Sequence, residues 1–217
     1  MASSRPGGLE NGSEQSEQYT YDALGRLKSI SVDGGLKETL AYDAEGLLAV
    51  RRFAAGASGT ETARYYIDKD LTVVQRPAGT LAYAHVIVGT HRVASVYVQA
   101  LGAAGQAMYY HRDRLGSVVG TSTTGAVAGT VVRYDLYGKT TTGGGTPGPV
   151  GTVGDTTVSE LGYSGGLNLS AGLVHLQARQ YAPGYRKFLQ ADTVDPLRYT
   201  YVRGIRRTSL IQPDAFK

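Results

Sequence analysis

The stretch Leu161–Asp192 reads LGYSGGLNLSAGLVHLQARQYAPGYRKFLQAD, and it decides how the rest of the chain is interpreted. Apolar and polar residues alternate along it, with breaks at Gly165-Gly166 and at Pro183-Gly184. Such alternation indicates half-buried β-strands, and Gly-Gly or Pro-Gly steps are typical of the turns between them. The stretch ends in a run of aromatic, basic and acidic residues. We therefore expect a compact set of short strands here.

The composition of the whole chain favours an all-β protein. Among 217 residues there are 30 Gly and 16 Tyr, whereas Trp and Cys are absent. Short segments rich in Tyr, Val and Thr and separated by Gly are typical of strands joined by turns. The absence of Cys excludes disulfides and thiolate chemistry, although it does not decide the compartment. No apolar run reaches the roughly 18–20 residues that a membrane-spanning helix needs.

Upstream of this stretch the chain repeats a Tyr-Asp unit. Residues 19–27 read YTYDALGRL, residues 42–47 repeat its centre as YDAEGL, and residues 131–139 read VVRYDLYGK. The first two units lie about 20 residues apart, a period that indicates stacked β-hairpins. Residues 64–99 are interpreted as a β-meander. Within it LAYAHVIV is predicted to be a strand, because it is β-branched and bounded by Gly.

We predict one β domain at 19–204, preceded by a disordered leader at 1–18 and followed by a tail at 205–217. The leader is polar and lacks the basic and then apolar layout of a secretory signal. The Gly/Thr/Pro-rich run at 141–159 predicts a flexible surface loop inside the domain, because both of its flanks share the same repeat style.

The formal net charge is +4, and the basic residues are dispersed except for Arg203, Arg206 and Arg207. A short basic end is more typical of a solvated tail than of a binding patch. We therefore expect no nucleic-acid partner.

The four histidines give little support for a metal site or a catalytic site. His85, His91, His111 and His175 lack the spacing of metal ligands and have no Cys to assist them, so we expect no metal or cofactor. His111 and Asp113 share one face of a predicted strand. A polar face with a local ion pair is a simpler interpretation of this pair than a catalytic role.

Serine and aspartate side chains offer two further kinds of catalytic site. Gly162, Ser164 and Gly166 match the letters of G-x-S-x-G, but that motif needs a strand-to-helix turn, and another alternating strand follows here. Asp192 and Asp195 stand at the end of the stretch. Two carboxylates that share a proton can hydrolyse a peptide bond. A spacing of three on an extended chain puts these two on opposite faces, however.

An ordered series of segments resembles the Rhs family. The Tyr-Asp units resemble its YD repeats, and the opening stretch is similar to its repeat-associated core. The matching segments are YYHRDRLGSV at 109–118, YDLYGK at 134–139, GYSG at 162–165, GLVHLQARQY at 172–181, FLQAD at 188–192 and RYTYV at 198–202.

This resemblance implies an all-β fold: YD hairpins in a curved sheet, forming all or part of a hollow shell that the core segment seals. Relatives include the C components of insecticidal Tc complexes, Rhs effectors delivered by type VI secretion, and teneurins. The implied partners are other YD-repeat segments, a second copy of the chain, or an enclosed toxin polypeptide. The implied location is secreted or at the cell surface after export by a non-classical route, with a cytoplasmic stage before export.

The chain also departs from the family pattern. D-P-x-x-G-R-F is replaced by APGYRKF at 182–188, and the D-P-x-G cleavage motif expected after Val202 has no match. Asp192 corresponds to the first proteolytic Asp of the family. We therefore expect a shell protein or fragment without enzymatic activity or a toxin domain. Its unpaired edge strands should drive association with a second copy or with other repeat segments, or should pair with each other and close the sheet.

Two alternatives stay open. One is a degenerate aspartyl autoprotease that uses Asp192 to process a C-terminal segment. The other is a surface adhesion or carbohydrate-binding module that uses ladders of Tyr side chains, whose rings can stack on sugars.

Overall fold

The computed structural model describes residues 3–6, 15–55, 61–98, 105, 107–123, 132–141, 152–153, 156–157 and 160–191. The described residues contain β-strands and short 3₁₀ turns but no α-helix. The strands form antiparallel sheets of eleven, four and two strands. The prediction of an all-β, hairpin-built, curved sheet is confirmed, including the strand assignment of LAYAHVIV, which lies in β8.

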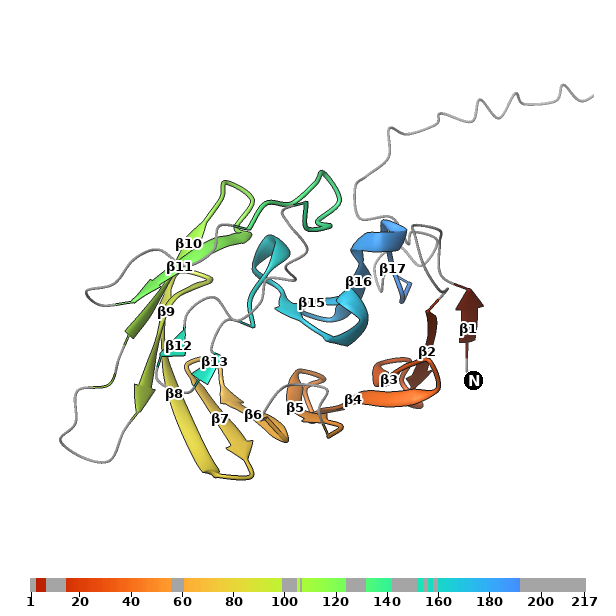
Figure 1. Cartoon of the computed structure of the whole chain (residues 1–217), viewed down its shortest axis with the longest axis horizontal. Coiled ribbons are helices and arrows are strands. Elements are labelled where there is room, and N and C mark those ends of the chain that lie inside the picture. The colour runs from red at the N-terminus through yellow and green to blue at the C-terminus, as the bar shows by residue number, and fades with distance from the viewer. Residues whose placement is uncertain are drawn as a thin grey trace, which may run out of the picture.

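The eleven-stranded sheet, here called the wall, follows chain order from β1 to β11, and each strand pairs with the next. It curves without closing on itself (Figure 1). Its strands are β1 (Ser3–Pro6), β2 (Ser16–Tyr21), β3 (Leu27–Val32), β4 (Gly35–Tyr42), β5 (Leu48–Phe53), β6 (Ala63–Asp68), β7 (Leu71–Arg76), β8 (Gly79–Val88), β9 (His91–Val98), β10 (Ala107–Arg112) and β11 (Val118–Thr123).

One turn design recurs in the three Tyr-Asp units and in the segment 109–118, where Arg112 takes the place of the Tyr. In each copy Oδ1 of the Asp accepts the backbone N–H of the residue four positions later, and the Asp carbonyl accepts the N–H of the Gly three positions later. Each of these glycines has φ between 76° and 86°, a left-handed conformation in which any other residue is strained. The four turns are those of Asp22, Asp43, Asp113 and Asp135.

The same units also bend the wall. The strand register shifts just before three of these turns, at Thr20/Tyr21, Ala41/Tyr42 and His111/Arg112. A β-bulge inserts an extra residue on one strand and increases the local twist. The recurring Asp-x-x-Gly turn therefore reverses the chain, and the bulges beside three of its copies contribute part of the curvature.

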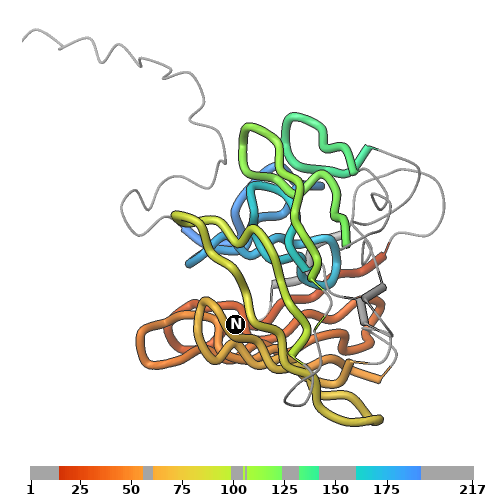
Figure 2. Tube along the Cα trace, turned by 90° about the vertical axis from the view of Figure 1, so that its left-hand side faces the viewer, coloured from red at the N-terminus to blue at the C-terminus, as the bar shows by residue number. Residues whose placement is uncertain are grey.

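The segment 160–191, here called the inner segment, lies on the concave side of the wall in two perpendicular views (Figures 1 and 2). It forms the four-stranded sheet of β14 (Leu167–Asn168), β15 (Val174–Leu176), β16 (Arg179–Ala182) and β17 (Lys187–Phe188). Three 3₁₀ turns connect or precede these strands: η1 (Tyr163–Gly165), η2 (Ser170–Gly172) and η3 (Pro183–Tyr185).

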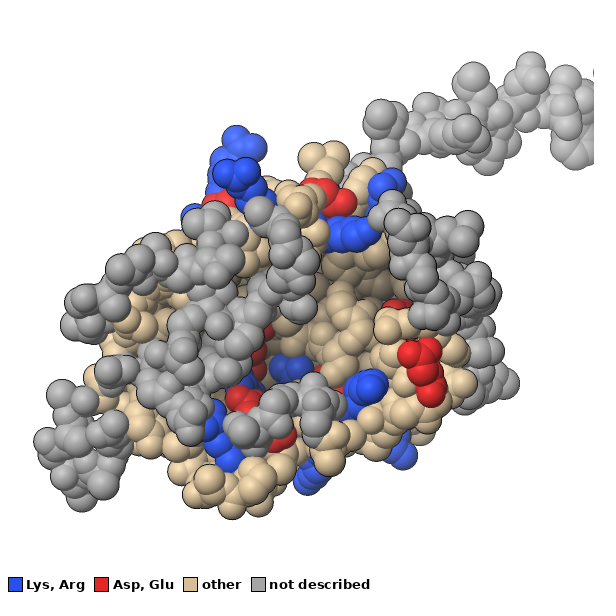
Figure 3. All heavy atoms as spheres, viewed as in Figure 1, with Lys and Arg blue, Asp and Glu red and all other residues tan. Residues whose placement is uncertain are grey.

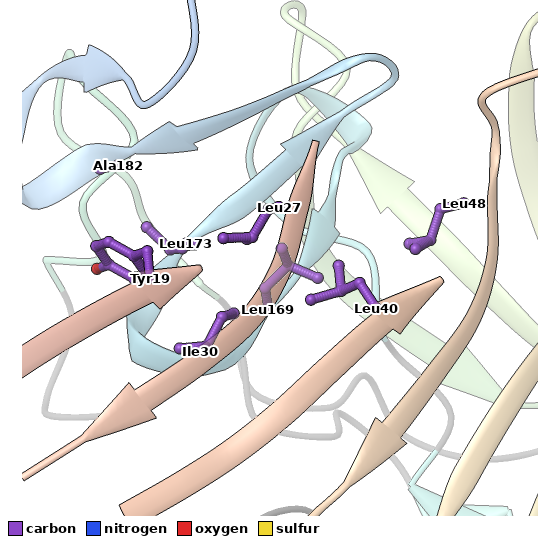
Figure 4. Packing of buried hydrophobic residues seen from close by; sticks show 8 residues of the cluster. All are labelled: Tyr19, Leu27, Ile30, Leu40, Leu48, Leu169, Leu173 and Ala182. Carbon is purple, nitrogen blue, oxygen red and sulfur yellow. The ribbon is translucent and has the colours of Figure 1, made fainter. Parts of the chain in front are cut away.

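The hydrophobic core lies between the wall and the inner segment. In one cluster, Leu169, Leu173 and Ala182 of the inner segment pack on wall residues of β2 to β5, all drawn in Figure 4: Tyr19, Leu27, Ile30, Leu40 and Leu48. In a second cluster, Leu161 packs on residues of β7, β8, β10 and β11, namely Val74, Tyr83, Met108, Tyr110 and Val118. The inner segment thus packs on the concave face at both of these clusters.

Some predicted boundaries differ from the structure. β1 and the first residues of β2 fall inside 1–18, the predicted leader, because polar residues can pair through their backbones at the edge of a sheet. Within the predicted loop 141–159, the structure describes Thr141 and the short pair β12 (Thr152–Val153) and β13 (Thr156–Thr157). The rest of that loop and the predicted tail 205–217 lie outside the described residues.

Candidate functional site

Glu160, the first residue of the inner segment, lies buried against the concave face of the wall. Its Oε2 is 2.6 Å from Nη1 of Arg64, and its Oε1 is 3.1 Å from Nη1 of Arg92. Nη1 of Arg51 lies 3.7 Å away, and the hydroxyl of Tyr66 donates to Oε2 at 2.7 Å. Burial alone would raise the pKa of Glu160, but the three guanidinium groups lower it well below its usual range.

Two of these arginines have a second carboxylate partner on the wall. Arg51 on β5 binds Glu38 on β4, and Arg64 on β6 binds Glu61 at 2.6 Å. Counted within this cluster, the wall contributes three guanidinium groups and two carboxylates, so one positive charge is left over. The carboxylate of Glu160 balances it. Buried charges are tolerated only when they are paired. The buried charges of the wall are therefore balanced only when the inner segment is docked.

The molecule is hollowed on the side that Figure 3 shows. From one side, the space-filling view opens into a cavity between the wall and the inner segment, and acidic and basic side chains lie close together in and around it (Figure 3).

Backbone groups of the inner segment are also held by wall side chains. Oε2 of Glu38 accepts the N–H of Ser170 at 2.9 Å, and Nη2 of Arg51 donates to the carbonyl of Asn168 at 2.8 Å. Glu38 and Arg51 therefore bind each other and the inner segment at the same time. Removing either side chain would leave the other buried with an unmet charge.

Wall and inner segment also meet at β11. The N–H of Val118 donates to the carbonyl of Gly162 at 3.0 Å, and Oγ of Ser117 accepts the N–H of Ser164 at 3.1 Å. The hydroxyl of Tyr181 donates to the carbonyl of Tyr137 at 2.8 Å. The first two contacts hold the start of the inner segment against the β11 end of the wall, and the third joins β16 to the turn that follows Asp135.

A chain of buried polar side chains crosses four wall strands. Nε2 of His85 lies 2.8 Å from Oγ1 of Thr72, its Nδ1 lies 2.7 Å from Oγ of Ser95, and that oxygen lies 2.8 Å from the hydroxyl of Tyr110. Burial, assisted by the charge of Arg92, lowers the pKa of His85 to about 3. The imidazole is therefore neutral. Ser95 is 1% exposed, so its hydroxyl is a structural partner rather than an accessible nucleophile.

The residues singled out from the sequence lie in different places. Nε2 of His111 pairs with Oγ of Ser122 at the surface, whereas Asp113 accepts backbone N–H groups of its own turn. These are the contacts of a polar strand end and a turn. Ser164 lies in η1, which leads into β14 rather than into an α-helix, so the context of a nucleophile elbow is missing.

The two acids weighed as proteolytic residues, Asp192 and Asp195, lie outside the described residues. Among the residues that the structure does describe, no three His, Asp or Glu side chains gather as metal ligands. No helix in the same part of the chain has the length and apolar character to cross a bilayer.

Sequence reasoning missed the charged cluster around Glu160. A signal was present for one of the arginines: Arg51 shares its strand face with the apolar Ala49 and Phe53 on β5, whereas Arg64 shares its face with Tyr66 and Asp68 on β6. Nothing in the sequence paired them with a Glu about a hundred residues away, because that pairing depends on how the inner segment folds back.

No family model matches this chain, and no curated protein does. Solved structures do match. A chain of the TcdB2–TccC3–Cdc42 crystal structure aligns over 86% of this chain with a TM-score of 0.66 and 19% identity. A chain of the Photorhabdus luminescens Tc holotoxin pore, carrying a substitution in TccC3, aligns over 86% with a TM-score of 0.65 and 17% identity. This chain spans about a tenth of those chains, 10% and 9% respectively. At such identity the likeness shows a shared fold.

Proposed function

We propose that this chain is a wall-and-seal unit of an Rhs-type β-shell, associated with toxin delivery and without enzymatic activity of its own. The observation that carries the proposal is the inner segment, which docks in the concavity of the wall and supplies the carboxylate of Glu160 to three wall arginines. The fold shared with chains of TcdB2–TccC3 complexes supports it.

A sealing role has a physical basis in this interface. The inner segment contributes apolar side chains to two core clusters and one carboxylate to a buried ionic cluster. The apolar contacts supply affinity, because their burial is favourable in proportion to area. The ionic cluster fixes the inner segment in one docking position, because a shifted segment would leave charges buried and unpaired. A seal needs both properties.

The proposed partners follow from the open sheet. A sheet that does not close leaves edge strands whose backbone groups can pair with another strand. We propose that the partners are further YD-repeat segments or a second copy of the chain, with a toxin polypeptide as cargo of the completed shell. The proposed location is outside the producing cell or at its surface, after a cytoplasmic stage and non-classical export.

Limited trypsin digestion tests the seal, because the inner segment carries Arg179, Arg186 and Lys187 as cleavage sites. We expect slow cleavage at these sites in the native protein and fast cleavage in Glu160→Gln. Glu45→Gln removes an exposed carboxylate on a turn and serves as the matched control. Cleavage of the native inner segment as fast as in Glu160→Gln would refute the sealing role.

Light scattering after size exclusion tests the association. We expect species larger than one chain, whose mass rises with protein concentration. A monomer at all concentrations would contradict pairing through free edges.

Autoproteolysis at Asp192 remains the alternative activity, and intact-mass measurement decides it. A cut downstream of Asp192 that disappears in Asp192→Asn would replace the non-enzymatic proposal. An uncut chain supports a purely structural role.

A further inference from the structure

His175 lies where the inner segment meets the wall. It belongs to β15, is 5% exposed, and its ring centroid is 6.5 Å from that of Tyr42 on β4. Its strand neighbour on β14 is the apolar Leu167. The imidazole is therefore enclosed by both parts of the interface rather than by the inner segment alone.

The hydrogen bonds around His175 define which of its nitrogens carries a proton. Oε1 of Gln180 accepts from the side-chain amide of Gln190, so Nε2 of Gln180 is the group that faces the ring. That amide nitrogen lies 2.8 Å from Nδ1 of His175 and 3.3 Å from the hydroxyl of Tyr42, which itself donates to the carbonyl of Leu27 at 2.9 Å. Nδ1 is thus an acceptor. A proton on it would face an N–H donor.

The charges facing the ring come from two wall strands. Arg51 on β5 disfavours the imidazolium, and Glu38 on β4 favours it, whereas Gln180 on β16 and Leu167 on β14 are uncharged. Glu38 and Arg51 are the residues that also bind the backbone of the inner segment at Ser170 and Asn168. A charge on His175 would therefore arise beside the contacts that hold the segment.

We propose that His175 is an acid-sensitive latch: protonation of its imidazole releases the inner segment from the concave face of the wall. The released segment exposes the ring to water, where imidazolium is well solvated and no amide opposes it. The latch regulates the seal and rests on the proposed function, since it needs a segment that is docked at neutral pH.

The size of the effect follows from the two states of His175. Burial, followed in importance by the charge of Arg51, lowers its pKa from the ordinary 6.5 to about 4 in the docked state. At pH 5 a solvated imidazole is mostly protonated and the docked one mostly neutral. Linkage then shifts the docking equilibrium toward release by roughly 30-fold between pH 7.5 and pH 5.

Hydrogen–deuterium exchange of the full chain measures this shift, once rates are corrected for the pH dependence of intrinsic exchange. The relevant peptides cover residues 167–182, because the short strands of the small sheet are marginal without the wall. We expect their protection to fall by about 30-fold from pH 7.5 to pH 5 and to lie below that of β7 and β8 at pH 5, because the segment is released from a wall that stays folded. His175→Gln retains an acceptor for Gln180 and has no titrating ring, so its protection should change by less than threefold.

His85→Gln is the matched control, because His85 is held by strands that remain in the wall after release. It should keep the response of the native chain. The latch is overturned if the native inner segment is equally protected at both pH values, if His175→Gln responds in full, or if β7 and β8 exchange as fast as residues 167–182 at pH 5. Unprotected exchange of residues 167–182 already at pH 7.5 would instead refute the seal itself.

Discussion

Oε2 of Glu160 lies 2.6 Å from Nη1 of Arg64, and this contact joins the first residue of the inner segment to a central strand of the wall. Both side chains are buried and each has further charged partners, so the contact belongs to a cluster rather than to an isolated surface pair. Surface pairs contribute little to stability, whereas breaking a buried cluster leaves an uncompensated charge.

Glu160→Gln should therefore lower the free energy of unfolding by about 3–5 kcal/mol, the usual cost of removing one partner from a buried ion pair. Urea unfolding at pH 7.5 measures this loss. Glu45→Gln, on an exposed turn, should change stability by less than about 0.5 kcal/mol. Equal stability of the two variants would mean that the cluster does not hold the segment.

Gly138 and Gly25 occupy the same position of the same turn, with φ of +86° and +76°. A Cβ at Gly138 would lie 2.5 Å from ring carbons of Tyr163 in the inner segment, whereas a Cβ at Gly25 would meet nothing within 4 Å. Gly25→Ala should cost about 1 kcal/mol through backbone strain alone. Gly138→Ala should cost about 1–3 kcal/mol more through overpacking. Thermal unfolding compares them, and similar losses would show that the turn at Gly138 does not press on the inner segment.

Ser95 and Ser122 each pair with a histidine, but only the first pair is buried. Ser95→Ala would leave Nδ1 of His85 and the hydroxyl of Tyr110 short of a partner, at a cost of about 1–3 kcal/mol. Ser122→Ala, at the surface, should cost less than about 0.5 kcal/mol. Urea midpoints of the two variants test this difference. A larger loss in Ser122→Ala would contradict the buried polar chain.

The stability of the whole fold should depend on pH through His85. Burial depresses its pKa to about 3, so the unfolded chain takes up a proton before the folded chain does. The contribution of His85 is therefore fully present above about pH 6.5 and is lost as pH falls from there toward 3. At pH 5 the loss is about 2 kcal/mol relative to pH 7.5. His85→Gln should lack this part of the pH dependence in urea titrations, and an unchanged profile would show that the ring is solvated.

Part of this fold was predictable because the relevant forces are local. The Asp and Gly of each Tyr-Asp unit make their hydrogen bonds within five residues, so the turns at Asp22 and Asp43 could be inferred from letters alone. The strand assignment of β8 likewise follows from β-branching and flanking glycines. The polar strand β1 escaped prediction, because backbone pairing at a sheet edge leaves no pattern in side chains.

The candidate site was not predictable to the same degree. Sequence reasoning directed attention to Ser164 and Asp192, because both lie in recognisable sequence motifs. The structure instead concentrates buried charge at Glu160, Arg51 and Arg64, which belong to no motif. The role of these three residues depends on which side chains lie next to them in the folded chain.

By itself, the sequence of this chain determined an all-β series of hairpins and singled out Leu161–Asp192 as the stretch that decides how the rest is interpreted. The alternation of apolar and polar residues and the turn preferences depend on residues close together in the sequence, so both can be inferred without the tertiary structure. Only the tertiary structure decided that this segment fills the concavity of the wall, that Glu160 balances the wall arginines, and that His175 faces Tyr42. Those relationships arise from burial, which removes water from charges and rings that are distant along the chain and close in space.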